Sequence, residues 1–213
     1  WPTAPVYTSV HVPDRMPRGF LAARQVRTSF LQRAPLRDRL WPGYVTLCPL
    51  AFRSFDLKGY EIVVSSASFA AKSIRKAAGS FHVCYCHTPP RFLWGYETAR
   101  DRSALTLPTR VLLHGVETVL RREDYAAAQR VDLFVANSET VRQRIRRAYS
   151  RDAVVVHPPV DTVALSAIEP RDGSYFLVVS RPGRYKRLDL AVRACEERGV
   201  DLHVVGSTEQ DAI

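Results

Sequence analysis

The sequence predicts an α/β protein in which helices cover parallel β-sheets. Short apolar runs, typical of buried strands, alternate with longer stretches in which apolar residues recur at helical spacing. Strands and helices that alternate in this way form βαβ units, and such units build a parallel sheet. The expected strands are residues 60–65, 81–86, 131–136, 153–157, 175–180 and 201–205. The expected helices are 19–34, 68–77, 108–130 and 186–198, with another that begins at the N-cap Ser138 and presents Val141, Ile145 and Tyr149 on one face.

The apolar pattern divides the chain into two parts. It lapses between Asp161 and Asp172, so this segment is expected to be a linker. We expect an N-terminal domain over residues 1–165 and the start of a second domain over residues 172–213. In the first domain, Val6–Val10 predicts an early strand.

Composition limits the classes of function. The chain has 213 residues, of which 46% are hydrophobic, and this is enough for a folded core. Its net charge of +10 favours an anionic partner: nucleic acid, a membrane surface or a phosphorylated ligand. The four cysteines form no C-x-x-C pair, so we expect reduced, mostly buried thiols and no zinc site. No apolar run reaches the roughly 18 residues that suggest a membrane span.

Residues 15–44 combine positive charge with apolar and aromatic side chains. Seven arginines lie between Arg15 and Arg39, near Phe20, Phe30 and Trp41. This combination suits an anionic membrane surface, and an ordinary solvated basic face is the alternative. We expect no nucleic-acid partner, because no recognised nucleic-acid-binding module accompanies the arginines.

A basic loop links the strand 175–180 to the next helix. The helix presents one apolar face, made by Leu188, Ala191, Val192 and Cys195. Before it stand four cations: Arg181, Arg184, Lys186 and Arg187. Cations oppose the positive end of the helix macrodipole, and a bound phosphate or diphosphate would compensate for them. A solvated basic loop is the alternative.

His87 follows the strand 81–86, at the carboxyl end where open α/β sheets place their ligands. An imidazole there can donate a hydrogen bond, or bring charge, to a sugar hydroxyl or to a leaving phosphate. The alternative is a histidine with a structural role.

Several motifs together resemble glycosyltransferase family four, and in particular its mannosyltransferase branch. The run VVSRPGRYKRLDLAVRA, in which Arg181 precedes Lys186 by five residues, is similar to the clamp that holds the donor diphosphate in that family. The block CYCHTPPRFLW around His87 resembles the family's sugar-transfer block. The segments RVDLFVANS and VHPPVD resemble further blocks, in the same order along the chain.

The resemblance implies a GT-B fold, in which a Rossmann-like N-terminal domain is followed by a second Rossmann-like domain that is incomplete here. It implies transfer of a hexose, mannose from GDP-mannose, to a lipid-linked or polysaccharide acceptor with retention, and no obligatory metal or other cofactor. Arg181 and Lys186 would bind the donor diphosphate, and His87 would contact the transferred sugar. The other implied lining residues are Gly206 near the nucleoside, with Ser138, Arg91 and Trp94.

The sequence also departs from the family pattern. The family's opening strand and glycine-rich turn would precede Trp1, and its acidic pair would follow Ile213. We therefore expect an internal fragment that is inactive alone, from a cytoplasmic enzyme peripheral to the inner face of the plasma membrane. A non-catalytic basic module that binds membranes or phosphate is the alternative, and an RNA-binding protein is the weakest hypothesis.

Overall fold

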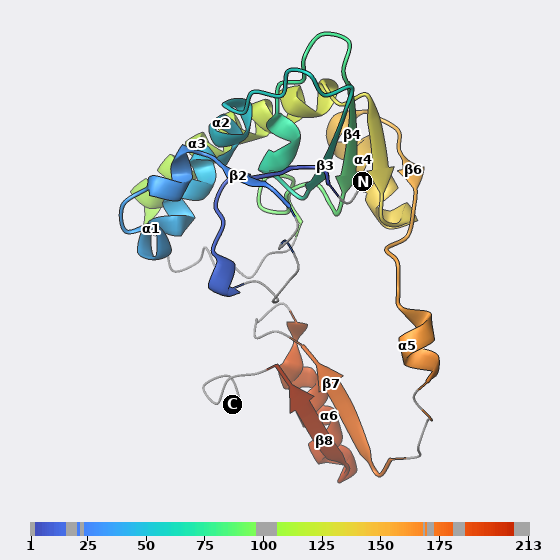
Figure 1. Ribbon diagram of the computed structural model, residues 1–213. Helices are drawn as coiled ribbons and strands as arrows, with labels where there is room; N and C mark the ends of the chain where they lie inside the picture. The colour runs from blue at the N-terminus through green and yellow to red at the C-terminus, as the bar shows by residue number, and fades with distance from the viewer. Residues whose placement is uncertain are drawn as a thin grey trace. The chain divides into compact units, whose positions relative to one another are not determined.

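The computed structural model describes residues 3–15, 21, 24–96, 106–167, 169, 173–180 and 186–206 (Figure 1). The chain divides into two compact units. The first comprises Trp1–Gly95 and Thr106–Pro158, and the second comprises Tyr96–Leu105 and Pro159–Ile213. A short helix, α5 (Thr162–Ser166), occupies part of the predicted linker.

A four-stranded parallel sheet lies at the centre of the first unit, in the order β3-β4-β5-β6 (Figure 1). Its strands are β3 (Ile62–Ala67), β4 (Phe81–Cys86), β5 (Leu133–Ala136) and β6 (Val154–Val155). All four were predicted, although β6 is shorter than the expected 153–157. The α/β class and its Rossmann-like parallel sheet are confirmed.

Two helices cover one face of this sheet. They are α3 (Leu107–Gln129) and α4 (Glu139–Tyr149). Side chains alternate along a strand, so Cys84 and Cys86 point to the same face, where both are buried against these helices. All four cysteines are free, as predicted, and Cys195 alone among them is only half-buried.

The opposite face of the sheet is more open than the apolar sequence predicts. Ile62 is 50% exposed, Val64 55% and Val154 54%. The strand predicted at residues 60–65 is expected to be buried, but within the described residues only the α3–α4 face is tightly covered. The open face also carries Ser66 and Tyr85, which pair in register on β3 and β4.

The helix predicted at residues 19–34 is wrong for the part of that range that the structure describes. Strand β2 (Val26–Thr28) pairs in parallel with β1 (Val6–Thr8), and a 3₁₀ turn, η2 (Phe30–Arg33), follows. The cause is Ser29, whose hydroxyl accepts from the N–H of Leu31 at 3.2 Å and donates to the carbonyl of Ser9 at 2.8 Å. These bonds begin a new turn where the helix was expected to continue.

The helix predicted at 68–77 is also wrong. It is only a 3₁₀ turn, η4 (Ala70–Ser73), which ends where Ile74 leaves the helical region with ψ of 155°, and Lys72 within it turns inward to a buried acid. Conversely, α1 (Arg37–Tyr44), η3 (Val45–Leu47) and α2 (Cys48–Arg53) were not predicted. Pro49 lies in the first turn of α2, where a missing N–H costs nothing. A further turn, η1 (Pro13–Arg15), follows β1.

A buried ion pair joins η4 to α3. The Nζ of Lys72 donates to Asp124, and the two residues are 1% and 3% exposed. The second carboxylate oxygen of Asp124 accepts from the Trp94 indole N–H at 2.9 Å and from the Tyr149 hydroxyl at 2.7 Å. Burial and the neighbouring Asp124 carboxylate raise the pKa of Tyr149, so its phenol stays protonated as a donor. A charge this deep is tolerated because every oxygen of the carboxylate is used.

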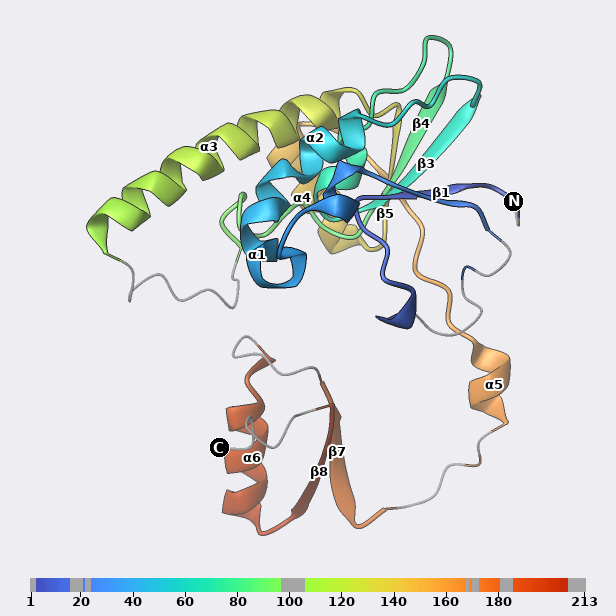
Figure 2. The same cartoon turned by 60° about the vertical axis from the view of Figure 1, so that its left-hand side comes forward.

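The second unit contains a βαβ motif. Strands β7 (Tyr175–Val179) and β8 (Asp201–Val205) are parallel, and α6 (Leu188–Arg198) connects them (Figure 2). The helix face predicted from Leu188, Ala191, Val192 and Cys195 is confirmed, because these are its half-buried positions. Gly199, with φ of 59°, ends the helix in the left-handed conformation that favours glycine.

The buried pair predicts an asymmetric response to mutation. Replacing Lys72 by Met leaves the buried Asp124 carboxylate without a cation. We therefore expect the unfolding free energy to fall by roughly 3–5 kcal/mol. The double variant Lys72→Met with Asp124→Asn should recover most of that loss, because a neutral amide oxygen still accepts from Trp94 and Tyr149. Urea unfolding of both variants measures the difference. A double variant no more stable than the single one would contradict this account.

Candidate functional site

Polar residues from all four strands meet at the carboxyl edge of the central sheet. They are Ser66 on β3, His87 after β4, Asn137 after β5 and His157 after β6. Hydrogen bonds join them in the order of the strands: Ser66 Oγ to His87 Nε2 at 2.8 Å, Asn137 Nδ2 to the His87 carbonyl at 3.2 Å, and His157 Nδ1 to the Asn137 carbonyl at 3.2 Å. We call these four residues the edge cluster. Parallel strands bring their carboxyl ends together, and this gathers residues 91 positions apart in the chain.

His87 is exposed at the position that the sequence predicts. Its backbone N–H donates to the carbonyl of Ala67 at 3.0 Å, which extends the β3–β4 pairing by one residue. The ring meets the Tyr85 ring edge-on, with 5.3 Å between centroids. A hydroxyl and an aromatic edge therefore orient an imidazole that remains open to solvent.

Ser138 is the N-cap of α4, as predicted. Its hydroxyl accepts from the N–H of Val141 at 3.3 Å and donates to Oδ1 of Asn137 at 3.1 Å. Both bonds are local, so Ser138 fixes the start of α4 and the side chain of Asn137. Asn137 was not singled out from the sequence, although its place after a strand and before an N-cap could have indicated it.

Tyr85 links the two histidines of the edge cluster. It shares a face of β4 with His87, and its hydroxyl donates to the carbonyl of Val156 at 3.1 Å. Val156 in turn donates its N–H to the carbonyl of Ala136 at 2.9 Å. The backbone immediately before His157 is thus held from two sides.

The loop after His87 carries two other predicted site residues. Arg91 is exposed, whereas Trp94 is half-buried and donates to Asp124 in the core. The loop is further tied by Arg144, which donates to Thr88 Oγ1 at 3.3 Å, and by Arg121, which donates to the Leu93 carbonyl at 2.7 Å. The contact seen for Trp94 anchors this loop, and a role of Trp94 or Arg91 in lining a ligand site stays a prediction.

The histidine within β4, His82, has a different environment from His87. His82 is 1% exposed, and its Nε2 lies 2.8 Å from Ser65 Oγ near the amino edge of the sheet. Burial lowers the pKa of His82 from 6.5 to about 4, so the ring is neutral at physiological pH. It belongs to the core, away from the edge cluster.

The predicted diphosphate clamp belongs to the second unit. Arg181 and Arg184 lie outside the described residues. Lys186 is exposed two residues before α6, so one cation of the pair stands near a helix start as expected. Arg187 differs from expectation, because its guanidinium pairs with Asp189 in the first turn at 3.0 Å. This carboxylate partly compensates the basic loop.

Gly206 follows β8 with φ of 94°. A Cβ built there would lie 2.6 Å from the carbonyl oxygen of Ser180, at the end of β7. The Ser180 N–H also donates to the Val205 carbonyl at 3.0 Å. A close backbone approach is expected at Gly206, and in the structure the group that approaches it is the Ser180 carbonyl of the same chain. The proximity of Gly206 to a nucleoside stays a prediction.

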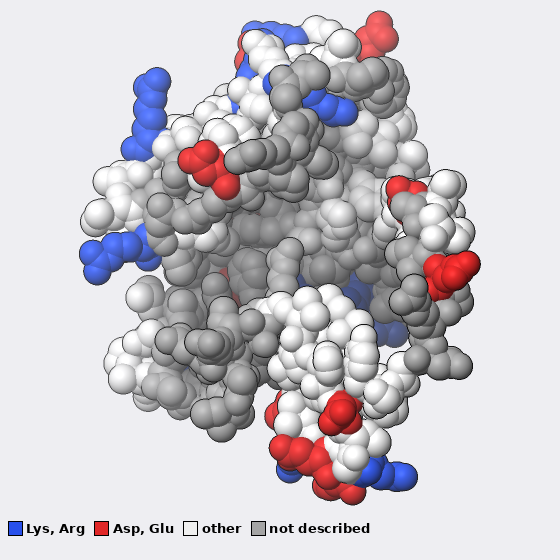
Figure 3. Space-filling view, turned by 60° about the horizontal axis from the view of Figure 1, so that its bottom comes forward, with Lys and Arg blue, Asp and Glu red and all other residues white. Residues whose placement is uncertain are grey.

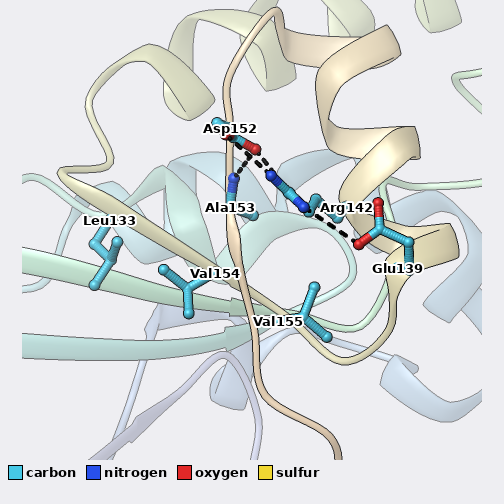
Figure 4. Close-up of a pocket in the computed structure, with 7 residues that line it drawn as sticks. All are labelled: Leu133, Glu139, Arg142, Asp152, Ala153, Val154 and Val155. Atoms are coloured by element: carbon cyan, nitrogen blue, oxygen red, sulfur yellow. Dashed lines mark hydrogen bonds and ion pairs between the residues drawn. The ribbon is translucent and has the colours of Figure 1, made fainter.

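An open hollow of about 530 Å³ lies beside β6 (Figure 4). Its charged lining residues pair with one another: Arg142 donates to Asp152 at 3.0 Å and to Glu139 at 3.4 Å. Arg142 and Arg146 hold the pKa of Asp152 well below its usual range. None of the predicted site residues lines this hollow, and its one arginine is already satisfied by carboxylates.

No group of three or more His, Cys, Asp or Glu residues in the described ranges could hold a metal ion. In the same part of the chain, no helix has the combination of length and apolarity needed to cross a bilayer.

The comparison with protein families decides the class of the protein. Residues 8–164, from β1 to α5, match the model of Glycosyltransferase Family 4. The chain belongs to this family. No curated protein and no solved structure matches it. A family 4 glycosyltransferase uses a nucleotide-sugar donor and an acceptor, so the family resemblance noted in the sequence is confirmed at this level. The edge cluster of the family 4 domain is its candidate site for sugar transfer.

Gly206 supplies a test of the second unit. Gly206→Ala places a methyl group against the Ser180 carbonyl in a backbone conformation that alanine rarely adopts, and we expect a cost of about 1–3 kcal/mol. Gly173→Ala is the control, because its Cβ would meet only ordinary contacts at 3.8 Å. Thermal unfolding of both variants compares them, and equal stability would contradict the close approach.

Proposed function

We propose that this family 4 glycosyltransferase moves mannose from GDP-mannose, with retention, to a lipid-linked or polysaccharide acceptor, without a metal ion or other cofactor. The observation that carries the proposal is the exposed His87, oriented by Ser66 and Tyr85 at the carboxyl edge of a parallel sheet. Ligands of open α/β sheets bind at this edge. The choice of mannose and GDP rests on the similarity of the Arg181–Lys186 segment to the mannosyltransferase branch.

The proposed roles follow from charge and position. His87 can exchange a hydrogen bond with a hydroxyl of the transferred sugar. Arg181 and Lys186 would bind the donor diphosphate and stabilise the negative charge that the leaving group gains. Gly206, Ser138, Arg91 and Trp94 remain proposed lining residues of the donor or acceptor site.

Calorimetric titration of the full chain with GDP and UDP tests the clamp. A charge-assisted hydrogen bond contributes about 1.5–3 kcal/mol, so Arg181→Ala or Lys186→Ala should weaken GDP binding roughly 10–100-fold. Arg198→Ala is the control, because Arg198 is an exposed cation at the far end of α6. His87→Ala should leave GDP binding unchanged and lower the rate of mannose transfer. Equal affinity for UDP, or clamp variants that bind GDP normally, would contradict the proposal.

We also propose that α1 and α2 dock on an anionic membrane, as a lipid-linked acceptor would require, at the inner face of the plasma membrane. Four leucines are exposed along these helices and their junctions: Leu36, Leu40, Leu47 and Leu50. Two arginines close to them in the sequence are also exposed: Arg33, at the end of η2, and Arg39, in α1. Apolar side chains next to arginines fit the interface of a bilayer that contains anionic lipid. Figure 3 shows Lys and Arg side chains projecting into solvent at several places on one face of the molecule.

Sedimentation with vesicles that contain phosphatidylglycerol tests this docking. Each arginine near an anionic surface contributes about 1 kcal/mol, so Arg33→Gln with Arg39→Gln should weaken vesicle binding at least tenfold. The control, Arg193→Gln with Arg198→Gln, removes the same charge from α6. If both pairs weaken binding equally, the attraction comes from net charge alone and the assignment to α1 and α2 is wrong.

A further inference from the structure

The edge cluster contains a second imidazole for which the proposed mechanism gives no role. His157 is exposed after β6, and its Nδ1 lies 3.2 Å from the carbonyl oxygen of Asn137. A carbonyl oxygen only accepts hydrogen bonds, so Nδ1 must carry the proton. In a neutral imidazole the other nitrogen, Nε2, then bears a lone pair and accepts.

The surrounding backbone keeps this tautomer in place. Asn137 is held by its side chain, which donates to the His87 carbonyl at 3.2 Å and accepts from the Ser138 hydroxyl at 3.1 Å. The preceding residue, Val156, is bound through both its N–H and its carbonyl, the latter by Tyr85 at 3.1 Å. The Asn137 carbonyl and the His157 ring are therefore presented to each other by ordered strand ends.

The two imidazoles of the edge cluster differ in chemistry. The Nε2 of His87 faces the Ser66 hydroxyl, a group that both donates and accepts, so this contact permits either tautomer of His87. The carbonyl partner of His157 permits only one neutral form. An accepting nitrogen repels the oxygens of a phosphate and suits an O–H donor. In its neutral form His157 is thus suited to a sugar hydroxyl and unsuited to the donor diphosphate.

We propose that Nε2 of His157 accepts a hydrogen bond from a hydroxyl of the acceptor glycan. This inference rests on the proposed sugar transfer and adds an acceptor-binding residue to it. His157 positions the acceptor at the edge of the first unit, and the predicted diphosphate clamp belongs to the second unit. The proton of the hydroxyl stays on its oxygen in this interaction.

Nitrogen NMR of the full chain tests the inference without requiring turnover. Long-range ¹H–¹⁵N correlations distinguish the two neutral tautomers, and the spectrum of His157→Asn identifies the His157 signals. We expect a proton on Nδ1 and an Nε2 resonance that shifts when n-octyl β-D-glucopyranoside, a soluble glycolipid, is added with GDP. A ring protonated on Nε2, or an Nε2 resonance that the glycolipid does not move, overturns the inference.

Two amide variants separate acceptor binding from a structural role. An Asn side chain reaches the Nδ1 position and keeps a donor for Asn137, whereas Gln reaches the Nε2 position with a carbonyl oxygen. With octyl glucoside as acceptor, loss of one neutral hydrogen bond should raise the acceptor KM about tenfold in His157→Asn, and His157→Gln should recover part of this loss. GDP affinity and melting temperature should stay at the values of the unmodified chain.

The outcomes distinguish this inference from the proposed function. An unchanged acceptor KM in His157→Asn overturns the role of His157 while the transferase stands. If the melting temperature or the GDP affinity falls together with the KM change, His157 has a structural role. That result also overturns the inference. Failure of the unmodified chain to transfer any sugar, with the expected Nε2 shift intact, counts against the proposed function alone.

Discussion

The first unit depends on one buried carboxylate. Asp124 on α3 receives the ammonium of Lys72, the indole of Trp94 and the phenol of Tyr149, and so it connects η4, the loop after β4, α3 and α4 at a single point. Because such a charge is costly unless all its partners are present, arrangements that separate Asp124 from these partners are disfavoured. The same contacts hold the loop that leaves His87, through Trp94. A carboxylate on the covered face of the sheet thereby helps to set the geometry of its polar edge.

The edge cluster arises from ordinary local rules applied at four strand ends. The Ser138 cap that starts α4 also orients Asn137, and Asn137 then bonds to the neighbours on both sides. No strained non-glycine backbone is needed at any of the four positions, since the positive φ values outside glycine lie elsewhere in the described chain. A family 4 glycosyltransferase can therefore keep two imidazoles exposed and oriented at little cost to its fold.

The sequence predicted those features that depend on local pattern. The apolar strands, the amphipathic face of α6, the cap at Ser138 and the strand-end position of His87 all follow from spacing that can be read directly. Features set by distant partners could not be read in this way. Lys72 looks like a surface cation until Asp124, 52 residues away, is placed beside it. The local pattern predicts a helix over residues 19–34, because it does not reveal the pairing of β1 with β2 or the bond from Ser29 to Ser9. The cluster partners of His87 were missed for the same reason, since only strand order brings His157 near it.

The hydrogen-bonded order of the edge cluster also has a consequence for how such a site can arise or be lost. Ser66, His87, Asn137 and His157 come one from each strand, so no short peptide contains two neighbouring members of the set. A segment that carries only β6 and the residues after it would bring His157 without Asn137, whose carbonyl orients it. The full set therefore requires all four strands, and the hydrogen-bonded cluster is complete only when β6 is paired with β5.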